Sequence, residues 1–525
     1  MNKAQAIDAA RNILVSARSY EAQRLDRIAA AMLPWTPENA MGHLHVKGQT
    51  GDPHPLAGLA LRAQTNFLPL VLDTFSQSMK VDNYFSSADK VTARPWQWWQ
   101  RNKLDARQAG VHRSALQYGA SYVSVLPSLV SGSEDAAFIR GISPRQMTAL
   151  YGEPMEWDPR RDTPTDDDWP IMALEIKGPM IRLYDEKSVH FIGIKNQPVS
   201  QFGWADPAYS NVSNFEYIEG RDHGVGVCPI VRFQDRMLLD GEEQFGIIEP
   251  LLAIQSRIDE TTFEMLIAQY YSSFIQRYVI GWMPDDQAQA LRQAASDTWF
   301  FKDPDVKVGQ FDAGDLKGYL ESKASAVRDL SAIGQVPAQN LGIDGISNIS
   351  EAALAALETG KERKSSEIET SFGESWEQVL RTSAHITGDA ESAADFASEV
   401  KWRDATARSF AQTVDGLGKL AQMLDVPVEA LWEDIPGWTK TKVDRAKVAA
   451  TARDLGILPV DELADADAMK RKFDALGVAI RAGVDPQDAA TQVGLSGTKF
   501  TGAIPVSLRP LAADATGLED KGGGL

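Results

Sequence analysis

The chain has 525 residues, of which 43% are hydrophobic and 24% are charged, and its formal net charge is −19. These values are typical of a soluble globular protein with roughly two to four domains. The acidic balance excludes a tight, isolated nucleic-acid binder, because affinity for phosphate groups comes from lysine and arginine. It does not exclude a surface past which a polyanion slides without sticking.

Cysteine use and hydrophobic runs narrow the class further. The chain has one cysteine, Cys228, which permits no intrachain disulfide and no cysteine-based zinc site. The N-terminus lacks the charged-then-apolar order of a signal peptide, and no window approaches about 18 uninterrupted apolar residues. We therefore expect a soluble protein without a membrane span, present in the cytoplasm when it is made.

The N-terminal part is expected to be helical. Apolar residues recur at helical spacing over 2–34 and again over 56–78. Between these helices lies a loop with His43, His45 and His54. A His-x-His pair can ligate a metal, but no third ligand stands at suitable spacing, so solvated loop histidines are the favoured interpretation.

Three tryptophans crowd residues 96–99. Stacking on nucleobases is one interpretation, and a buried aromatic cluster at the start of a helix is the favoured one. A helix over 109–118 is then expected to lead into a strand over 119–125.

From residue 138 to residue 233 the chain is rich in β-branched and aromatic residues and is expected to form strands. The expected strands are 147–151, 171–177, 181–184, 189–195 and 230–233, with turns at 157–159 and 219–222. The acidic run 166–168 could bind a divalent cation, but it lacks the spaced oxygen ligands of a calcium loop. A solvated loop is favoured there.

The stretch 246–387 is expected to organise the chain around two amphipathic helices that bracket a compact β-rich insert. The first helix begins at Glu249 and Pro250, with a proline in its first turn, and the second ends at Pro337. The apolar stripes are Leu251, Ile254, Ile258, Thr261, Met265 and Ala268 in the first helix, and Leu316, Leu320, Val327, Leu330 and Ile333 in the second. The two helices should lie antiparallel, each on the order of 35 Å long. They must then pack on the body of the chain or on copies of themselves; a helical hairpin inside one globular domain is equally compatible.

The insert and the segment after the second helix have their own patterns. Strands are expected at 274–280, 299–301 and 306–308, with a short helix from Pro284. Residues 338–349 contain neither lysine nor arginine. Asn348 and Glu351 then resemble a capping pair for a long helix that runs toward His385.

The last part of the chain is expected to be helical after a short strand at 400–402, with prolines separating the helices. The glycine-rich end, 517–525, should be disordered. The expected fold class is therefore α+β, mainly helical.

The sequence contains no motif that argues for an enzyme. It has no phosphate-binding loop, serine nucleophile elbow, zinc-protease motif or dinucleotide-binding motif. Cys228 precedes a proline and a β run, which indicates burial rather than nucleophilic chemistry. We expect no catalytic residue, no cofactor and no metal. Two alternatives remain open: a soluble enzyme, such as a hydrolase with aspartate or histidine residues in 138–233, and a helical adaptor or scaffold that binds partner proteins through 241–387.

The order of several short motifs resembles the portal proteins of long-tailed bacteriophages, in particular the branch found in phages of actinobacteria. The motifs that carry the resemblance are Tyr118–Val123, Gly226–Phe233, Gly246–Gln255, Gln335–Gly342, Ser350–Ala353, Phe372–Gly373 before Trp376, and Val400–Asp404. Each motif is weak alone, but together their order and spacing cover most of residues 55–455. The N-terminal segment and the last part of the chain match poorly.

The resemblance implies a structural subunit of the virion. Such subunits form a ring, usually of twelve copies, at one vertex of the capsid, and double-stranded DNA is packaged and ejected through the ring. The implied partners are the large subunit of the terminase, a head–tail adaptor, and the major capsid and scaffolding proteins. The implied locations are the portal vertex of the virion and, during assembly, the host cytoplasm.

The resemblance also implies a division of the chain into named parts. These are an N-terminal helical segment (1–55), a wing (56–240), a first stem helix (241–273), a clip (274–311), a second stem helix (312–336), a tunnel loop (337–349), a long wing helix with a return strand (350–403), a helical crown (404–500) and a flexible tail (501–525). In this arrangement the stem helices of neighbouring copies bury each other's stripes, through a head-to-tail interface. Replacing Leu251 or Ile258 with aspartate is then expected to break ring assembly before it unfolds the subunit.

Site residues follow from these assignments. The expected tunnel-loop residues are Pro337, Gln339, Asn340, Leu341, Asp344, Ser347 and Asn348; the expected subunit-packing residues of the stem are Leu251, Ile254, Ile258, Met265, Leu320, Val327 and Leu330; and the expected clip-docking residues are Arg277, Tyr278, Trp282, Trp299 and Lys302. Lys317 and Arg328 stand eleven residues apart on one helical face and could form basic rings in the bore. An outward orientation of these two basic side chains into solvent is equally compatible with the sequence.

Overall fold

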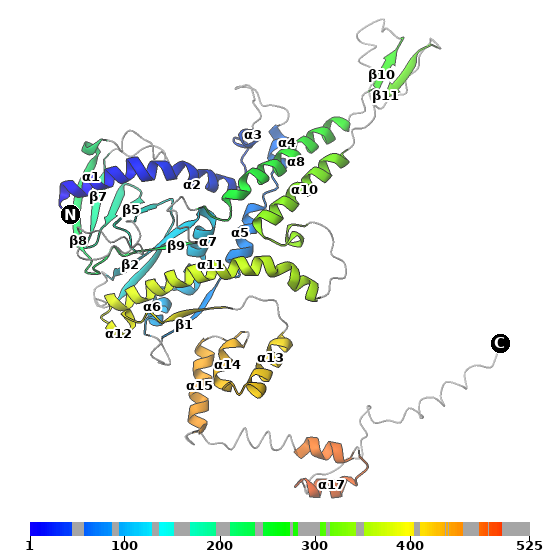
Figure 1. Ribbon diagram of the computed structural model, residues 1–525. Helices are drawn as coiled ribbons and strands as arrows, with labels where there is room; N and C mark the ends of the chain where they lie inside the picture. The colour runs from blue at the N-terminus through cyan, green and yellow to red at the C-terminus, as the bar shows by residue number, and fades with distance from the viewer. Residues whose placement is uncertain are drawn as a thin grey trace. The chain divides into compact units, whose positions relative to one another are not determined.

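The computed structural model (Figure 1) divides into two compact units, Met1–Ala407 and Arg408–Leu525. It describes residues 1–44, 57–86, 94–128, 136–151, 169–195, 211–236, 245–273, 277–281, 305–310, 316–342, 351–403, 410–435, 437–438, 440–454, 472–480 and 482–495. The chain is mixed α and β and mainly helical, as expected. Within these ranges, none of the helices has both the length and the apolar character needed to cross a bilayer.

The N-terminal helix confirms the prediction for 2–34 and adds one irregular turn. Helix α1 (Lys3–Ile13) continues through a π-helical turn, η1 (Leu14–Arg18), into α2 (Ser19–Met32). The buried Arg18 guanidinium donates to the backbone oxygens of Pro144 and Arg145. This contact ties the helix to the turn before the five-stranded sheet.

The helix expected over 56–78 is broken, so this prediction is wrong in part. The structure has α4 (Ala57–Ala63) and α5 (Leu68–Ser76), with non-helical backbone at 64–67. A short helix, α3 (Ala40–His43), also lies where a loop was expected. The ring of His43 stacks on Trp35, with ring centroids 5.1 Å apart, and the other two loop histidines lie outside the described residues.

Two antiparallel sheets of three and five strands form most of the described β structure of the first unit. The larger has the order β4 (Met147–Leu150), β5 (Met172–Lys177), β6 (Met180–Tyr184), β7 (Ser188–Ile194) and β8 (Phe215–Asp222), and the smaller has the order β3 (Ala137–Ile142), β2 (Ala120–Pro127) and β9 (Ile230–Gln234). A strand pair, β1 (Val81–Phe85) and β12 (Glu399–Trp402), stands apart. Helix α1 packs its alanine and isoleucine side chains on the larger sheet.

The strands predicted between 119 and 233 and at 400–402 are confirmed, but three strands, β1, β3 and β8, were missed. The strand expected at 299–301 lies outside the described residues. Strand β3 was not expected, and the turn predicted at 219–222 is wrong because these residues belong to β8, which pairs with β7. The turn at 157–159 and the acidic run at 166–168 lie outside the described residues.

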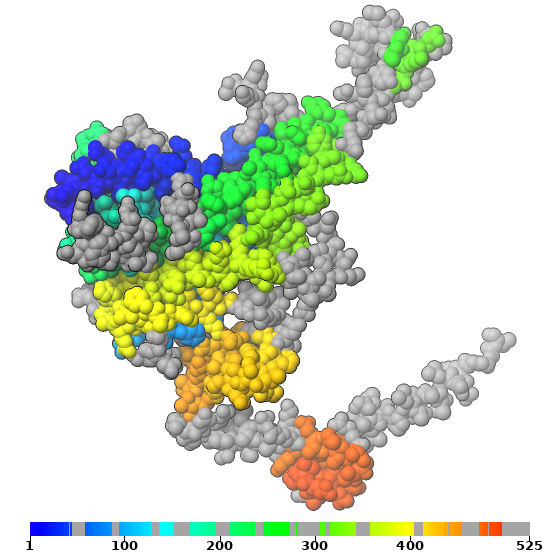
Figure 2. Space-filling model, viewed as in Figure 1, coloured from blue at the N-terminus to red at the C-terminus, as the bar shows by residue number. Residues whose placement is uncertain are grey.

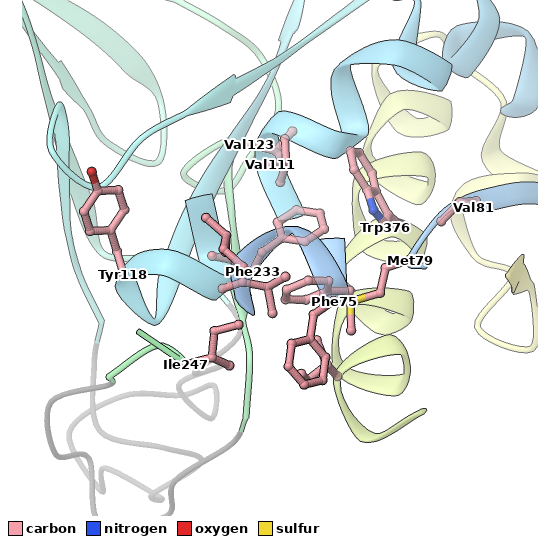
Figure 3. Packing of buried hydrophobic residues seen from close by; sticks show 14 of the residues in the cluster. Phe75, Met79, Val81, Val111, Tyr118, Val123, Phe233, Ile247 and Trp376 are labelled. Atoms are coloured by element: carbon pink, nitrogen blue, oxygen red, sulfur yellow. The ribbon is translucent and has the colours of Figure 1, made fainter. Parts of the chain in front are cut away.

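The main core lies where the three-stranded sheet meets helices α5, α6 (Trp96–Arg101), α7 (Leu104–Tyr118) and α11 (Glu351–Ile386) (Figure 3). The three clustered tryptophans are buried, so the aromatic-core interpretation is confirmed over nucleobase stacking. Trp96 and Trp99 stack with ring centroids 5.0 Å apart, and Trp99 meets Trp376 of α11 edge-on. These aromatic rings join residues that are distant in sequence.

A neutral histidine, His112, lies at the centre of this core. Its Nδ1 donates to the Met79 carbonyl at 3.2 Å, and its Nε2 accepts from the Trp376 indole N–H at 2.8 Å. Burial lowers the pKa of His112 to about 4 from an ordinary value of 6.5. Because the second bond needs an unprotonated nitrogen, the core holds the neutral ring.

This burial predicts an acid-sensitive core. The folded-state pKa lies below the unfolded value, so the contribution to stability is complete above pH 6.5 and declines as the pH falls toward 4. Between pH 7 and pH 5 we expect the loss to be about 2 kcal/mol. Denaturant unfolding of the wild type and of His112→Gln at both pH values checks this. An equal loss in the variant would contradict the assignment.

The second unit is helical, as predicted. Its described elements include α13 (Phe410–Met423), α14 (Val428–Leu431), η6 (Trp432–Asp434), α15 (Lys440–Asp454) and α17 (Pro486–Gln492), and residues 472–480 are also helical. Asp485 caps α17 by accepting from two backbone N–H groups. The glycine-rich end of the chain lies outside the described residues.

Candidate functional site

The candidate site is the pair of helices predicted to organise the chain. A 3-10 turn, η4 (Glu249–Leu251), leads into α8 (Leu252–Ser272), and the chain returns through α10 (Lys317–Gly334). Gly334 lies against Leu251, and Arg257 pairs with Asp329, so the start of α8 meets the end of α10. The helices are therefore antiparallel, as expected, and they run side by side in Figure 1 and Figure 2.

The start of α8 is anchored on the N-terminal helix. Arg24 and Arg27 of α2 both donate to the Glu249 carboxylate, at 2.8 and 3.0 Å. Pro250 occupies the first turn, where its missing N–H costs nothing. The base of the helix pair is thus held to the body of the subunit by charge as well as by packing.

Burial divides the helix pair into a proximal half and a distal half. Four stripe residues at the proximal end lie in the main core, namely Leu251, Ile258, Val327 and Leu330. The prediction that these four pack against neighbouring copies is wrong, because a single chain already buries them. Ile254 and Met265 are half-buried, whereas Leu320 is 55% exposed.

The distal half presents apolar side chains to solvent. Tyr270 and Tyr271 at the end of α8 are 46% and 54% exposed, and they meet edge-on. Leu320, on the first turns of α10, adds to this uncovered surface. Ile333, at the other end of α10, is also exposed. The distal end of the helix pair is therefore the candidate surface for a further partner.

A buried polar network, which the sequence did not reveal, fixes the proximal half. Gln255 and Asp259 of α8 reach the break between α4 and α5: the Thr65 N–H donates to Asp259 Oδ1 at 2.7 Å, and the Phe67 N–H donates to Gln255 Oε1 at 3.0 Å. Gln255 Nε2 donates to the Thr65 carbonyl and to Asp259 Oδ2. Lys323 of α10 completes the network by donating to Thr65 Oγ1 at 3.2 Å. The only sequence signal was a pair of polar residues four apart on the apolar side of α8.

Burial shifts two groups of this network toward their neutral forms. It raises the pKa of the Asp259 carboxyl, although hydrogen bonds from Gln255 and Thr65 act in the opposite direction. It lowers the pKa of the Lys323 ammonium, which Asp259 raises in part. The network therefore depends on complete hydrogen bonding.

Removing the carboxylate should loosen the base of the helix pair. Asp259→Ala leaves the Thr65 N–H without an acceptor and Gln255 Nε2 with one fewer, a loss of about 2–4 kcal/mol. Asp259→Asn keeps an acceptor for Thr65 and should cost about half as much. Thermal denaturation of the two variants checks the order. Equal midpoints for the wild type and Asp259→Ala would rule out a stabilising role.

The residues predicted for the tunnel loop begin directly after α10. Gln335 has a left-handed backbone (φ 54°), and a 3-10 turn, η5 (Ala338–Leu341), follows. Pro337 and Leu341 are buried, Gln339 is half-buried and Asn340 is exposed. The start of the loop is therefore part of the subunit core. Asp344, Ser347 and Asn348 lie outside the described residues, as does the expected capping pair.

The two bases proposed for the bore are both exposed. Lys317 stands at the start of α10, where it pairs with Glu321 at 3.6 Å, and Arg328 stands three turns later. Neither belongs to the core, so both remain candidates for a surface that a neighbour or a polyanion meets.

The predicted clip residues are described only in part. Strands β10 (Arg277–Ile280) and β11 (Lys307–Gln310) pair antiparallel, with Arg277 opposite Gln310 and Tyr278 opposite Gly309. The strands at both ends of the insert are thus confirmed. Trp282, Trp299 and Lys302 lie outside the described residues.

The β-rich region offers little to the enzyme alternative. His190 lies between Asp185 and Tyr217, with Nε2 3.1 Å from Asp185 Oδ2 and Nδ1 3.0 Å from the Tyr217 hydroxyl. Both ring nitrogens are therefore occupied, and the nearby Ser188 hydroxyl donates to Asp222 instead. Cys228 is buried, as predicted, and burial raises the pKa of its thiol. Among the described residues, no group of three or more histidine, cysteine or carboxylate side chains could hold a metal.

Comparison with known proteins identifies the family. The family model described as "Phage portal protein, SPP1 Gp6-like" matches residues 54–454, which is most of the chain. No curated protein matches the chain.

Solved structures of gene transfer agent (GTA) particles resemble the chain at low identity. A chain from the virion of a native particle is 13% identical with a TM-score of 0.41, and the match covers 75% of this chain and 94% of that one. A chain from the neck of an empty particle, computed with C6 symmetry, is also 13% identical, with a TM-score of 0.40 and coverage of 75% and 90%. A chain from the neck of a native particle, computed with C12 symmetry, is 13% identical, with a TM-score of 0.38 and coverage of 76% and 93%.

The family model covers most of the described first unit and the start of the second. The match spans α4 to α15, including the helix pair, the β10–β11 strands and both sheets. The chain belongs to the SPP1 Gp6-like family of phage portal proteins, and it is a structural component of the virion rather than an enzyme.

Proposed function

We propose that copies of this chain, twelve in the expected assembly, close into a ring at one vertex of the capsid. The ring would conduct double-stranded DNA during packaging and ejection. The observation that carries this proposal is the division of α8 and α10 into a proximal half buried in its own chain and a distal half that leaves Tyr270, Tyr271 and Leu320 uncovered. In a ring, adjacent helix pairs would cover each other's distal halves through a head-to-tail interface.

The named parts of the chain follow from this proposal. Helices α8 and α10 would be the stem, the 274–311 insert would be the clip, and 337–349 would be the tunnel loop. Both sheets and α11 would belong to the wing, and the unit from Arg408 onward would be the crown. The division near residue 407 lies close to the expected start of the crown at 404.

Partners are proposed from the same assignment. The clip would dock the large subunit of the terminase during packaging and the head–tail adaptor afterwards. The wing would meet the major capsid and scaffolding proteins. Kinship with portals of actinobacterial phages remains a prediction from the sequence motifs.

The helical-adaptor alternative also uses an exposed apolar surface, so the assembly state discriminates between the two. Native mass measurement or negative-stain imaging of the purified protein should show a closed ring of many 57.5 kDa subunits. A stable monomer or dimer under all assembly conditions would favour the adaptor and contradict the ring.

A further inference from the structure

The turn between α6 and α7, here called the α6–α7 corner, carries a group of basic side chains that form no ion pair among the described residues. Four basic residues there are exposed, namely Arg94, Arg101, Lys103 and Arg107. Within the described part of the chain, none of them forms an ion pair, whereas Arg113, Arg140, Arg145, Arg257 and Arg403 each pair with a carboxylate. Within the described stretch 94–110 there is one acid, Asp105, and it accepts from the Trp99 indole N–H at 2.9 Å. A local positive surface therefore stands on a chain whose net charge is −19.

The corner is held rigidly by buried side chains. Asn102 is 6% exposed, and its amide donates to the carbonyls of Trp98 and Ala137 and accepts from the Ile139 N–H. Lys103 follows with a left-handed backbone (φ 56°), a conformation that costs a non-glycine residue energy. The Arg101 guanidinium lies over the Trp98 ring, 5.5 Å from its centroid. The basic side chains are thus held on the surface by a rigid turn and not by a flexible loop.

The chemistry of the surface favours a polyanion over a protein partner. Protein interfaces place aromatic or aliphatic anchors at their centre. Along 94–110 the three tryptophans point into the core, and the exposed residues between the bases are polar or small, such as Gln97, Gln100 and Ala106. The adjoining β3 adds one half-exposed ring, Phe138. A positively charged surface with almost no apolar anchor would bind a polyanion through electrostatic attraction alone.

The position of the corner points to the polyanion. In Figure 1, α6 and the distal ends of α8 and α10 lie at opposite ends of the first unit. If α8 and α10 are the stem and the clip faces outward, the α6–α7 corner faces the capsid interior, where packaged DNA lies. This step rests on the proposed function. Lys103 at the N-cap of α7 and Arg107 in its first turn are both exposed on this corner.

We propose that the α6–α7 corner binds the phosphate backbone of double-stranded DNA without reading its sequence. Each ring would then present one such surface per subunit to the DNA packed against it. Because the contacts are to phosphates, binding weakens steeply with salt, and the slope falls by roughly 1 for each phosphate contact that is lost.

The test uses the assembled protein and a linear duplex of arbitrary sequence. Reversing the charge of three basic side chains together, with R101E, K103E and R107E, should weaken DNA binding by about tenfold or more in a gel-shift or fluorescence assay. The dependence of the affinity on salt concentration should become less steep. A matched variant with K177E, K187E and K195E reverses three exposed lysines of the five-stranded sheet and makes the same change in net charge. Its loss of affinity should be much smaller.

Equal losses for the two triple variants, or wild-type affinity for the corner variant, would overturn the proposal. If R101E, K103E and R107E together prevent folding, the neutral set R101Q, K103Q and R107Q should give a smaller loss in the same direction. Imaging of each sample reports ring formation separately. A ring that binds no DNA contradicts this inference alone, whereas a failure to form rings contradicts the proposed function. Binding of an acidic peptide in place of DNA would also overturn the inference.

Discussion

Ile258→Asp is expected to unfold the subunit rather than only to prevent ring assembly. Ile258 is 0% exposed and lies in the main core with Leu251 and Leu330. An aspartate there either buries a charge without a partner or becomes protonated, and either outcome costs several kcal/mol. Thermal denaturation and soluble yield measure the effect, and Leu251→Asp should behave in the same way.

The matched control is Leu320→Asp on the distal half of α10. Leu320 is 55% exposed in the single chain, so the charge meets water and the subunit should keep its stability. Ring assembly, measured by native mass or sedimentation, should be lost, because a neighbouring copy would have to bury the charge. A stable Ile258→Asp subunit, or a Leu320→Asp protein that forms normal rings, would contradict the division of the helix pair.

The second large effect is expected from deletion of 343–348 in the proposed tunnel loop. The deletion spares η5 and the buried Leu341, so the subunit and the ring should form. If the loop closes on DNA in the bore, particles assembled from the variant should lose most of their packaged DNA. Nuclease protection of DNA in purified particles measures the retention.

A replacement of 343–348 by glycine and serine of equal length separates loop length from side-chain chemistry. Retention by this variant but not by the deletion would show that length matters. Normal packaging by the deletion variant would refute the assignment of a tunnel loop to these residues.

The helices could be predicted well from the sequence, because the spacing of apolar residues along one helix face depends only on nearby residues. The spacing of apolar residues located α8, α10 and α11 and the end of α10 before Pro337. Periodicity identifies which face is apolar but not what covers it. Leu251 and Leu320 carry the same signal, yet one is buried in its own chain and the other is exposed.

The errors in the fold arise from contacts between distant residues. The break at 64–67 is stabilised by Gln255 and Asp259, which are close to 64–67 in space and remote in sequence. Residues 219–222 have turn-forming composition, but pairing with β7 extends them into β8. Such tertiary contacts override local propensity.

The candidate site could be predicted only in outline, because local patterns are visible in the sequence and contacts between distant residues are not. Paired helices, an insert at their far end and a following loop were visible in the sequence, whereas the Asp259 network and the α6–α7 corner were not. In the sequence, the basic residues of that corner look like ordinary surface residues. Only the fold shows that the neighbouring tryptophans are buried and that the basic side chains have no carboxylate partners among the described residues.

An electron cryomicroscopy map of the purified assembly tests the central claim most directly. The account predicts a closed ring in which α8 and α10 border a central channel and Tyr270, Tyr271 and Leu320 are covered by the neighbouring subunit. A map in which these helices point away from the axis, or in which their distal halves stay uncovered around a filled centre, would contradict it.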